Sequence, residues 1–162
     1  MKPPISKFTL GRSFSQDERQ CFVNYVRDGG GVEPLIGNAK TKKMSVLEDP
    51  ELSNIKAFCL DCIKKYTNDG DIYITDSWLT FSMPGEWHHC HNHPNSLLSG
   101  VFYVNTIRSL HTIVFPELGE ETVNVARGDL LLFPSPLLHY VPENPGNELR
   151  ISLAFNTSKP TK

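Results

Sequence analysis

The chain has 162 residues, the length of a single domain, and 39% of them are apolar, as in globular proteins. This composition excludes disordered, collagen-like and coiled-coil classes. Sixteen basic and eighteen acidic side chains give a net charge of −2, so no strongly basic surface for nucleic acid is expected. The longest apolar stretches have four residues, as in Leu130 to Phe133, and Met1 to Leu10 contains no signal-like apolar segment. We therefore expect a cytoplasmic protein without a membrane span.

The first 70 residues predict mainly helices. Ser15 with Glu18 three residues later forms a capping-box pattern, and the helix should run to about Arg27, before the glycines at 29–31. Residues 30–48 match no regular element. A second helix is expected from about Pro50 to Thr67, because its apolar residues recur at i, i+3 and i+4. These residues are Leu52, Ile55, Phe58, Cys59, Cys62, Ile63 and Tyr66.

The cysteines do not suggest a metal or disulfide framework. Cys59 and Cys62 form a C-x-x-C pair, but Cys21 and Cys90 are far apart and supply no second pair. Both members of the pair fall on the apolar stripe of the second predicted helix. We therefore expect them to pack in the core.

From Asp71 onward the pattern is that of short strands separated by glycine, proline and asparagine turns. Strands are predicted near 71–83, 87–92, 99–107, 111–116, 121–126, 129–134, 137–141 and 149–156. So many short strands at regular spacing indicate a β-sandwich or small barrel, covered on one side by the helices.

Four of the six histidines lie in the segment 88–93. Alternate side chains of a strand share a face, so His89, His91 and His93 should point one way and His88 the other. Neutral imidazoles gathered on one face are typical ligands of transition metals. The alternative is an exposed histidine-rich strand that binds nothing.

His139 and Arg150 lie farther along the chain, on either side of a proline-rich turn. His139 follows a hydrophobic run and should reach the mouth of a barrel. A hairpin is predicted to bring Arg150 and Ser152 close to it. An arginine on an otherwise apolar strand is costly to bury unless it meets an anion. A surface arginine is the alternative.

The spacing of these residues resembles the signature of the Fe(II)/2-oxoglutarate-dependent dioxygenases. That signature is H-x-D/E, then His about 50 residues later, then Arg after about ten more, often followed by x-Ser. Here it reads His91-Asn92-His93, His139 after 46 residues, and Arg150-Ile151-Ser152. Five segments in particular resemble the small 2-oxoglutarate oxygenases common in bacteria and marine phages. These segments are Ser77-Trp78, 91–96, 99–103, 128–135 and 150–156.

The resemblance implies a mainly β fold, a double-stranded β-helix (a jelly roll or cupin-like barrel) over residues 71–157. Residues 1–70 would be a helical lead-in within one domain, 1–162. The implied cofactor is Fe(II), held by His91, His93 and His139, and the implied cosubstrate is 2-oxoglutarate. Its distal carboxylate would be bound by Arg150 and Ser152, with Tyr103 as a further contact.

The function that follows is an oxygenase, most simply a hydroxylase, acting on a primary substrate that the sequence does not identify. The cosubstrate would be oxidatively decarboxylated to succinate. We expect small-molecule partners, no membrane and no nucleic acid, and the pattern leaves a homodimer open. The resemblance also indicates a bacterial or phage-encoded protein.

One departure from the signature leaves alternatives open. His93 stands where most of the superfamily has Asp or Glu, and a three-histidine site also occurs in cupin-type dioxygenases that use no 2-oxoglutarate. A non-redox, cupin-like metal protein is a further alternative. His89 could replace His93 as a ligand, and Glu86 is a weaker candidate because it lies in a predicted turn. Three other residues are expected to be packing or surface residues: Trp78, Trp87 and His111.

Overall fold

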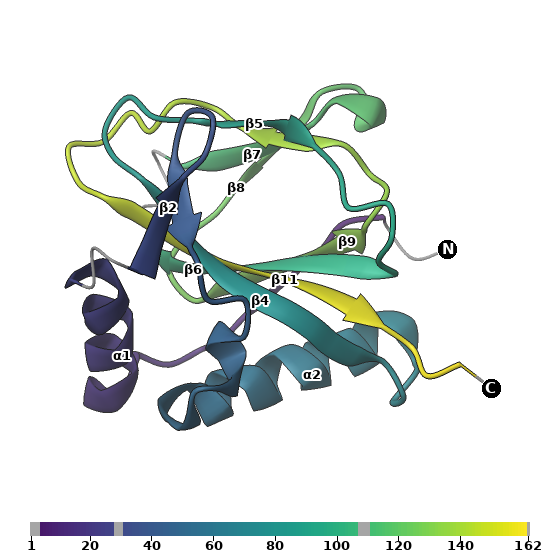
Figure 1. Ribbon diagram of the computed structural model, residues 1–162. Helices are drawn as coiled ribbons and strands as arrows, with labels where there is room; N and C mark the ends of the chain where they lie inside the picture. Colours follow the sequence, from purple (N-terminus) through teal and green to yellow (C-terminus); the bar gives the residue numbers. More distant parts are fainter. Residues whose placement is uncertain (1–3, 28–30, 107–110, 162) are drawn as a thin grey trace.

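The computed structural model describes residues 4–27, 31–106 and 111–161. Within these ranges the strands form two antiparallel sheets that enclose a barrel-like interior (Figure 1). The large sheet has the strand order β1 (Ser6–Thr9), β9 (Asp129–Pro134), β6 (Leu98–Asn105), β11 (Arg150–Ser158), β4 (Tyr73–Ser82), β3 (Ala39–Thr41) and β2 (Val32–Pro34). The small sheet has the order β5 (His88–His91), β10 (His139–Val141), β7 (Thr112–Phe115) and β8 (Glu121–Asn124). This is the predicted double-stranded β-helix, and β4 to β11 are the eight predicted strands.

Two helices, α1 (Gln16–Arg27) and α2 (Ser53–Thr67), cover the outer face of the large sheet (Figure 1). The capping box of α1 is confirmed: the Ser15 N–H donates to the Glu18 carboxylate at 2.7 Å, and the Glu18 N–H donates to Ser15 Oγ at 3.1 Å. Helix α1 ends at Arg27, as predicted, whereas Gly29 and Gly30, which were expected to stop it, lie outside the described residues. The structure also describes the 3-10 helices η2 (Val46–Glu48), η3 (Pro50–Leu52) and η4 (Pro116–Leu118).

The main hydrophobic core lies between the helices and the large sheet. Leu52, Ile55 and Cys59 are fully buried there against Leu153 and Phe155 of β11. Cys59 and Cys62 are both reduced and buried in this core, as predicted. A second apolar cluster fills the space between the two sheets, around Phe115, Leu131 and Phe133. No helix in the described parts of the chain combines the length and the apolar character that a membrane crossing needs.

Three strands that the sequence pattern did not predict come from the first 70 residues. Strand β1 pairs with β9, and β3 pairs with β4, where Ala39 lies opposite Phe81. Strands β2 and β3 form a hairpin inside the segment 30–48. With three or four residues each, these strands are too short for their own pattern to identify them, so the partner strand defines them.

The predicted hairpin between β10 and β11 is wrong. Strand β10 pairs with β5 and β7 in the small sheet, whereas β11 pairs with β4 and β6 in the large sheet. The chain therefore crosses from one sheet to the other between Val141 and Arg150. As a consequence, His139 and Arg150 lie on opposite walls of the same cavity.

Gly100 of β6 is a position where the fold requires the absence of a side chain. A Cβ atom built there would lie 2.1 Å from Phe155 Cζ. We expect Gly100→Ala to lower the free energy of unfolding by about 1–3 kcal/mol, because the ring of Phe155 would have to shift. Urea unfolding of both proteins measures this difference.

Gly70→Ala is the matched control. The nearest atom to a Cβ at Gly70 is Lys64 Cε at 3.9 Å, and its backbone does not require glycine. This variant should stay within about 0.5 kcal/mol of the parent. Equal stability of the two variants would contradict the close approach of Phe155 to β6.

Candidate metal centre

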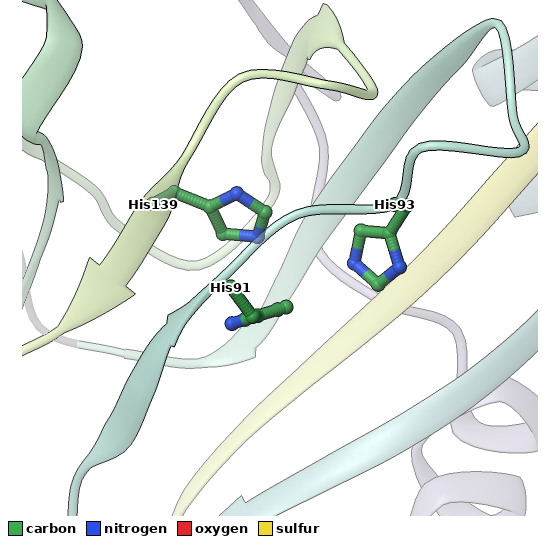
Figure 2. A group of neighbouring side chains, drawn as sticks. All are labelled: His91, His93 and His139. Carbon is green, nitrogen blue, oxygen red and sulfur yellow. The ribbon is translucent and has the colours of Figure 1, made fainter.

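Three imidazoles converge at one end of the barrel interior. His91 ends β5, His93 follows two residues later, and His139 begins β10. One ring nitrogen of each lies within 4.8 Å of the others, and Figure 2 shows the rings around a common space. Their ring centroids are 4.2 Å apart for His91 and His139 and 5.1 Å apart for His91 and His93.

A β-bulge in β5 decides which histidines face the interior. His91 pairs with His139 and His88 pairs with Val141, so β5 has one residue more than β10 between the two pairs. A bulge breaks the alternation of side chains, and here it places His88 on the same side as His91. The two rings stack with centroids 4.2 Å apart, and both line the cavity, while His89 is exposed. The prediction that His89 shares a face with His91, and that His88 points away, is therefore wrong.

Backbone carbonyls orient two of the three rings. His91 Nδ1 lies 2.7 Å from the His89 carbonyl oxygen, and His139 Nδ1 lies 3.1 Å from that of Leu137. In the tautomer that donates these hydrogen bonds, Nδ1 carries the proton and Nε2 keeps a free lone pair. His93 is held through its backbone N–H, which donates to the Ser135 carbonyl at 2.8 Å.

The environment keeps these imidazoles neutral. Burial, with a smaller contribution from the neighbouring His91, lowers the pKa of His139 to about 3. The hydrogen bond to the Leu137 carbonyl opposes this shift. Burial likewise lowers the pKa of His91 to about 4. For His93, burial lowers the pKa and the negative charge of Asp76 opposes that shift. Neutral imidazole is the form that binds a metal ion.

The three histidines border a cavity between the two sheets. On the opposite wall lie Arg150 and Ser152 of β11 and Tyr103 of β6. Arg150 is 5% exposed and has no carboxylate partner within the described residues. The buried Tyr103 hydroxyl also lacks a hydrogen-bond partner there. A buried cation and a buried donor without partners are complementary to an anionic ligand.

The structure separates the remaining candidates. Glu86 accepts a hydrogen bond from the Met83 N–H at 2.7 Å in the turn before β5 and does not line the cavity. Trp87 is exposed, as predicted, whereas Trp78 and His111 are buried and line the cavity. Sequence reasoning also missed six polar cavity residues. They are Asn38, Thr80, Ser82, His88, Ser99 and Thr112.

Only some of these missed residues left a signal in the sequence. Thr80 and Ser82 alternate with apolar residues along β4, a strand that was predicted, so their shared face could have been found. Asn38 lies in a segment without any recognisable pattern. His88 was placed on the wrong face because a bulge leaves no mark in the residue order.

Comparison with known proteins agrees with this geometry. The model of a family described as "Putative 2OG-Fe(II) oxygenase" matches residues 76–121 and 116–156, which together span half of the chain. The chain belongs to this family. None of the curated proteins compared with it matches.

Solved oxygenase structures share the fold of this family member at low sequence identity. A prolyl-4-hydroxylase from Pseudomonas putida has 14% identity and a TM-score of 0.72, with 98% of this chain and 94% of that chain covered. The viral collagen prolyl hydroxylase vCPH of Paramecium Bursaria Chlorella virus-1, in its 2OG complex, has 15% identity and a TM-score of 0.64, covering 99% and 97%. HygX from Streptomyces hygroscopicus, with nickel and 2-oxoglutarate bound, has 12% identity and a TM-score of 0.71, covering 98% and 83%.

The residues present fit the groups that the family name implies. Three neutral imidazole nitrogens on one side of the cavity are a donor set for a divalent transition metal. Arg150, which has no carboxylate partner among the described residues, and the unpaired Tyr103 hydroxyl suit the carboxylate of a 2-oxoacid.

We expect the metal-free protein to lose stability as the pH falls below about 6.5. The pKa values of His88 and His139 are lowered to about 3 and that of His91 to about 4, so the unfolded chain takes up protons first. The neutral histidines therefore lower the stability of the folded protein least above their pKa in the unfolded chain, about 6.5. The free energy of unfolding then decreases as the pH falls from about 6.5 towards the pKa values of the folded protein. For each of these histidines, the free energy of unfolding changes by at most about 1.4 kcal/mol per pH unit. Urea unfolding with a chelator at pH 7, 6 and 5 measures it.

Two variants provide the comparison. His139→Gln should make the pH dependence shallower, whereas His89→Gln should change it much less, because His89 is exposed and only adds a minor repulsion to His88 and His91. Equal slopes in the two variants would show that the acid sensitivity has another origin.

Proposed function

We propose that this family member is a hydroxylase that uses Fe(II) and 2-oxoglutarate. The observation that carries the proposal is the placement of two complementary half-sites on opposite walls of one cavity. A cluster of three neutral histidines lies on one wall, and a buried arginine without an anionic partner lies on the other.

His91, His93 and His139 are the proposed metal ligands. The His89 carbonyl accepts a hydrogen bond from Nδ1 of His91, and the Leu137 carbonyl accepts one from Nδ1 of His139. Nε2 of both rings is therefore available for coordination. Fe(II) held by these three histidines would supply the oxygen-dependent, oxidative decarboxylation of 2-oxoglutarate that accompanies hydroxylation.

Arg150, Ser152 and Tyr103 are the proposed cosubstrate contacts. Arg150 and Ser152 are two residues apart on β11 and face the cavity together, and Tyr103 lies opposite Ser152 on β6. The guanidinium offers two parallel N–H donors to the distal carboxylate, while the two hydroxyls can donate to its remaining lone pairs. The burial of Arg150 and Tyr103 excludes water from this end of the cavity and strengthens their hydrogen bonds.

The third histidine changes the charge of the centre. A carboxylate at position 93 would neutralise one positive charge of Fe(II), whereas an imidazole leaves both. The additional charge favours binding of the dianionic cosubstrate and makes the iron harder to oxidise. The presence of His93 also supports a second candidate, a three-histidine metal protein that does not use 2-oxoglutarate.

Replacing His139 with Ala should abolish stoichiometric binding of Fe(II), or of Ni(II), Co(II) or Mn(II) as substitutes. Because loss of an outer-shell partner alone costs about 10–100-fold in affinity, loss of a ligand should exceed about 100-fold. Calorimetric titration under anaerobic conditions measures the affinity.

His89→Ala is the control for this experiment, because His89 belongs to the same segment but is exposed. It should bind the metal as the parent does. Metal binding that survives in His93→Ala and disappears in His89→Ala would refute the proposed ligand set.

The iron-loaded protein should convert 2-oxoglutarate to succinate slowly in air, even without its primary substrate. His139→Ala should form no succinate, and His93→Asp should keep or increase the rate, because a carboxylate restores the common ligand set.

Arg150→Ala should weaken cosubstrate binding by about 2–5 kcal/mol, and Arg150→Lys should weaken it too, since an ammonium group lacks the planar fork. Succinate is measured directly, and binding through the visible charge-transfer band under anaerobic conditions.

Arg127→Ala is the matched control, since Arg127 is exposed and lies outside the cavity. It should bind 2-oxoglutarate as the parent does. A parent protein that binds metal but shows neither succinate nor a charge-transfer band would favour the second candidate.

A further inference from the structure

The cosubstrate contacts proposed above use only half of the cavity. In the large sheet, β11 lies between β6, which carries Tyr103, and β4, which carries Thr80 and Ser82. Tyr103 of β6, with Arg150 and Ser152 of the central strand β11, marks one half of the cavity, and Arg150 lies opposite Ser82 of β4. The other half lies towards β3 and is bordered by Asn38 and His88, with Thr80 and Ser82 of β4 between the two halves.

Asn38 is the unexplained residue of this second half. It directly precedes β3 and is 4% exposed, yet neither its amide nitrogen nor its amide oxygen has a hydrogen-bond partner in the described parts of the chain. Its side chain lines the same cavity as the histidine cluster. Leaving both polar atoms of a buried carboxamide unpaired destabilises a protein unless a ligand pairs with them.

The turn that presents Asn38 is held in place on both sides. Within the turn, the Leu35 N–H donates to the Asn38 carbonyl at 2.8 Å, and Gly37 has a φ of +89°. The Trp87 N–H donates to the Gly37 carbonyl at 3.2 Å. A Cβ at Gly37 would lie 2.6 Å from the Trp87 ring, so only glycine permits this close packing. The turn that carries Asn38 is therefore fixed against Trp87, the residue that precedes His88.

The chemistry of this half is neutral and polar. Of the described residues that line the whole cavity, Arg150 is the sole one with a formal charge, because the histidines are neutral and none is Asp, Glu or Lys. A carboxamide offers one donor and one acceptor side by side. A carboxylate would satisfy only the donor and an ammonium group only the acceptor. A group with an N–H and a C=O side by side satisfies both.

We propose that Asn38 is a specificity-determining residue that binds a neutral amide of the primary substrate, either a primary carboxamide or a cyclic amide. The inference rests on the proposed function, since it assigns the Arg150 half of the cavity to the cosubstrate. The amide would pair with the carboxamide of Asn38 in two hydrogen bonds and lie between β3 and the histidine cluster.

The test uses the full-length protein loaded with Zn(II), which is redox-silent, and two-dimensional ¹H–¹⁵N NMR. The side-chain NH₂ signals of Asn38 are those that disappear in Asn38→Ala. The probe is the cyclic amide 2-pyrrolidinone, which should shift these signals. N-methyl-2-pyrrolidinone lacks the N–H, and acetate lacks any donor, so both should shift them far less.

Two variants test the carboxamide itself. Asn38→Ala should bind 2-pyrrolidinone about fivefold to tenfold more weakly, since two hydrogen bonds are lost. In Asn38→Asp the side chain keeps its shape but has no N–H donor. A similar loss of affinity for 2-pyrrolidinone in this variant would exclude a packing defect as the cause. Unchanged Asn38 signals at 100-fold the concentration of protein, or equal responses to the cyclic amide and its N-methyl derivative, would overturn the proposal.

Addition of 2-oxoglutarate distinguishes this inference from the proposed function. It should shift the Arg150 Nε–H signal and leave the Asn38 signals nearly unchanged. If the Asn38 signals shift as strongly as those of Arg150, Asn38 binds the cosubstrate and the inference fails while the proposed function stands. If neither group responds to 2-oxoglutarate, the proposed function fails, and the inference fails with it because the assignment of the two halves is lost.

Discussion

The pairing of β5 with β10 is the constraint on which the candidate site depends. His91 lies opposite His139 in this pair, so the hydrogen bonding of two short strands brings together residues that are 48 positions apart in the sequence. The bulge one step farther along β5 turns a second histidine, His88, into the cavity and leaves His89 outside. A strand without the bulge would present a different set of imidazoles to the interior.

Burial then sets the chemical state of both walls. The histidine cluster is neutral because burial and mutual repulsion lower the pKa values of its members. On the facing wall, Arg150 is buried without a carboxylate, an arrangement that is stable only if an anion or its neighbours compensate for it. The protein thus places a wall with neutral imidazoles opposite a wall with one buried guanidinium, across one cavity.

The hairpin of β2 and β3 extends the large sheet beyond the barrel strands and brings a further polar group to the cavity. Gly37 and Trp87 hold its turn, and Asn38 follows with an unpaired carboxamide. In this structure the residues that precede the barrel therefore do more than cover the outer face of the large sheet.

Much of this protein can be predicted from its sequence because the relevant signals are local. The eight strands β4 to β11, the helix after Ser15 and the helix before Asn68 follow from alternation, i, i+3, i+4 spacing and capping residues. The three clustered histidines, Arg150, Ser152 and Tyr103 were found from a resemblance in motif and spacing.

The tertiary structure alone decided the rest. The short strands β1, β2 and β3 form because they pair with neighbouring strands of the large sheet. Strand β11 lies in the large sheet and does not pair with β10. Whether His88 or His89 faces the cavity depends on a single extra residue in a strand pair. Asn38 lines the cavity from a turn that packs against Trp87, a residue distant in the sequence. These features arise from pairing and packing between distant segments, which no local pattern of residues encodes.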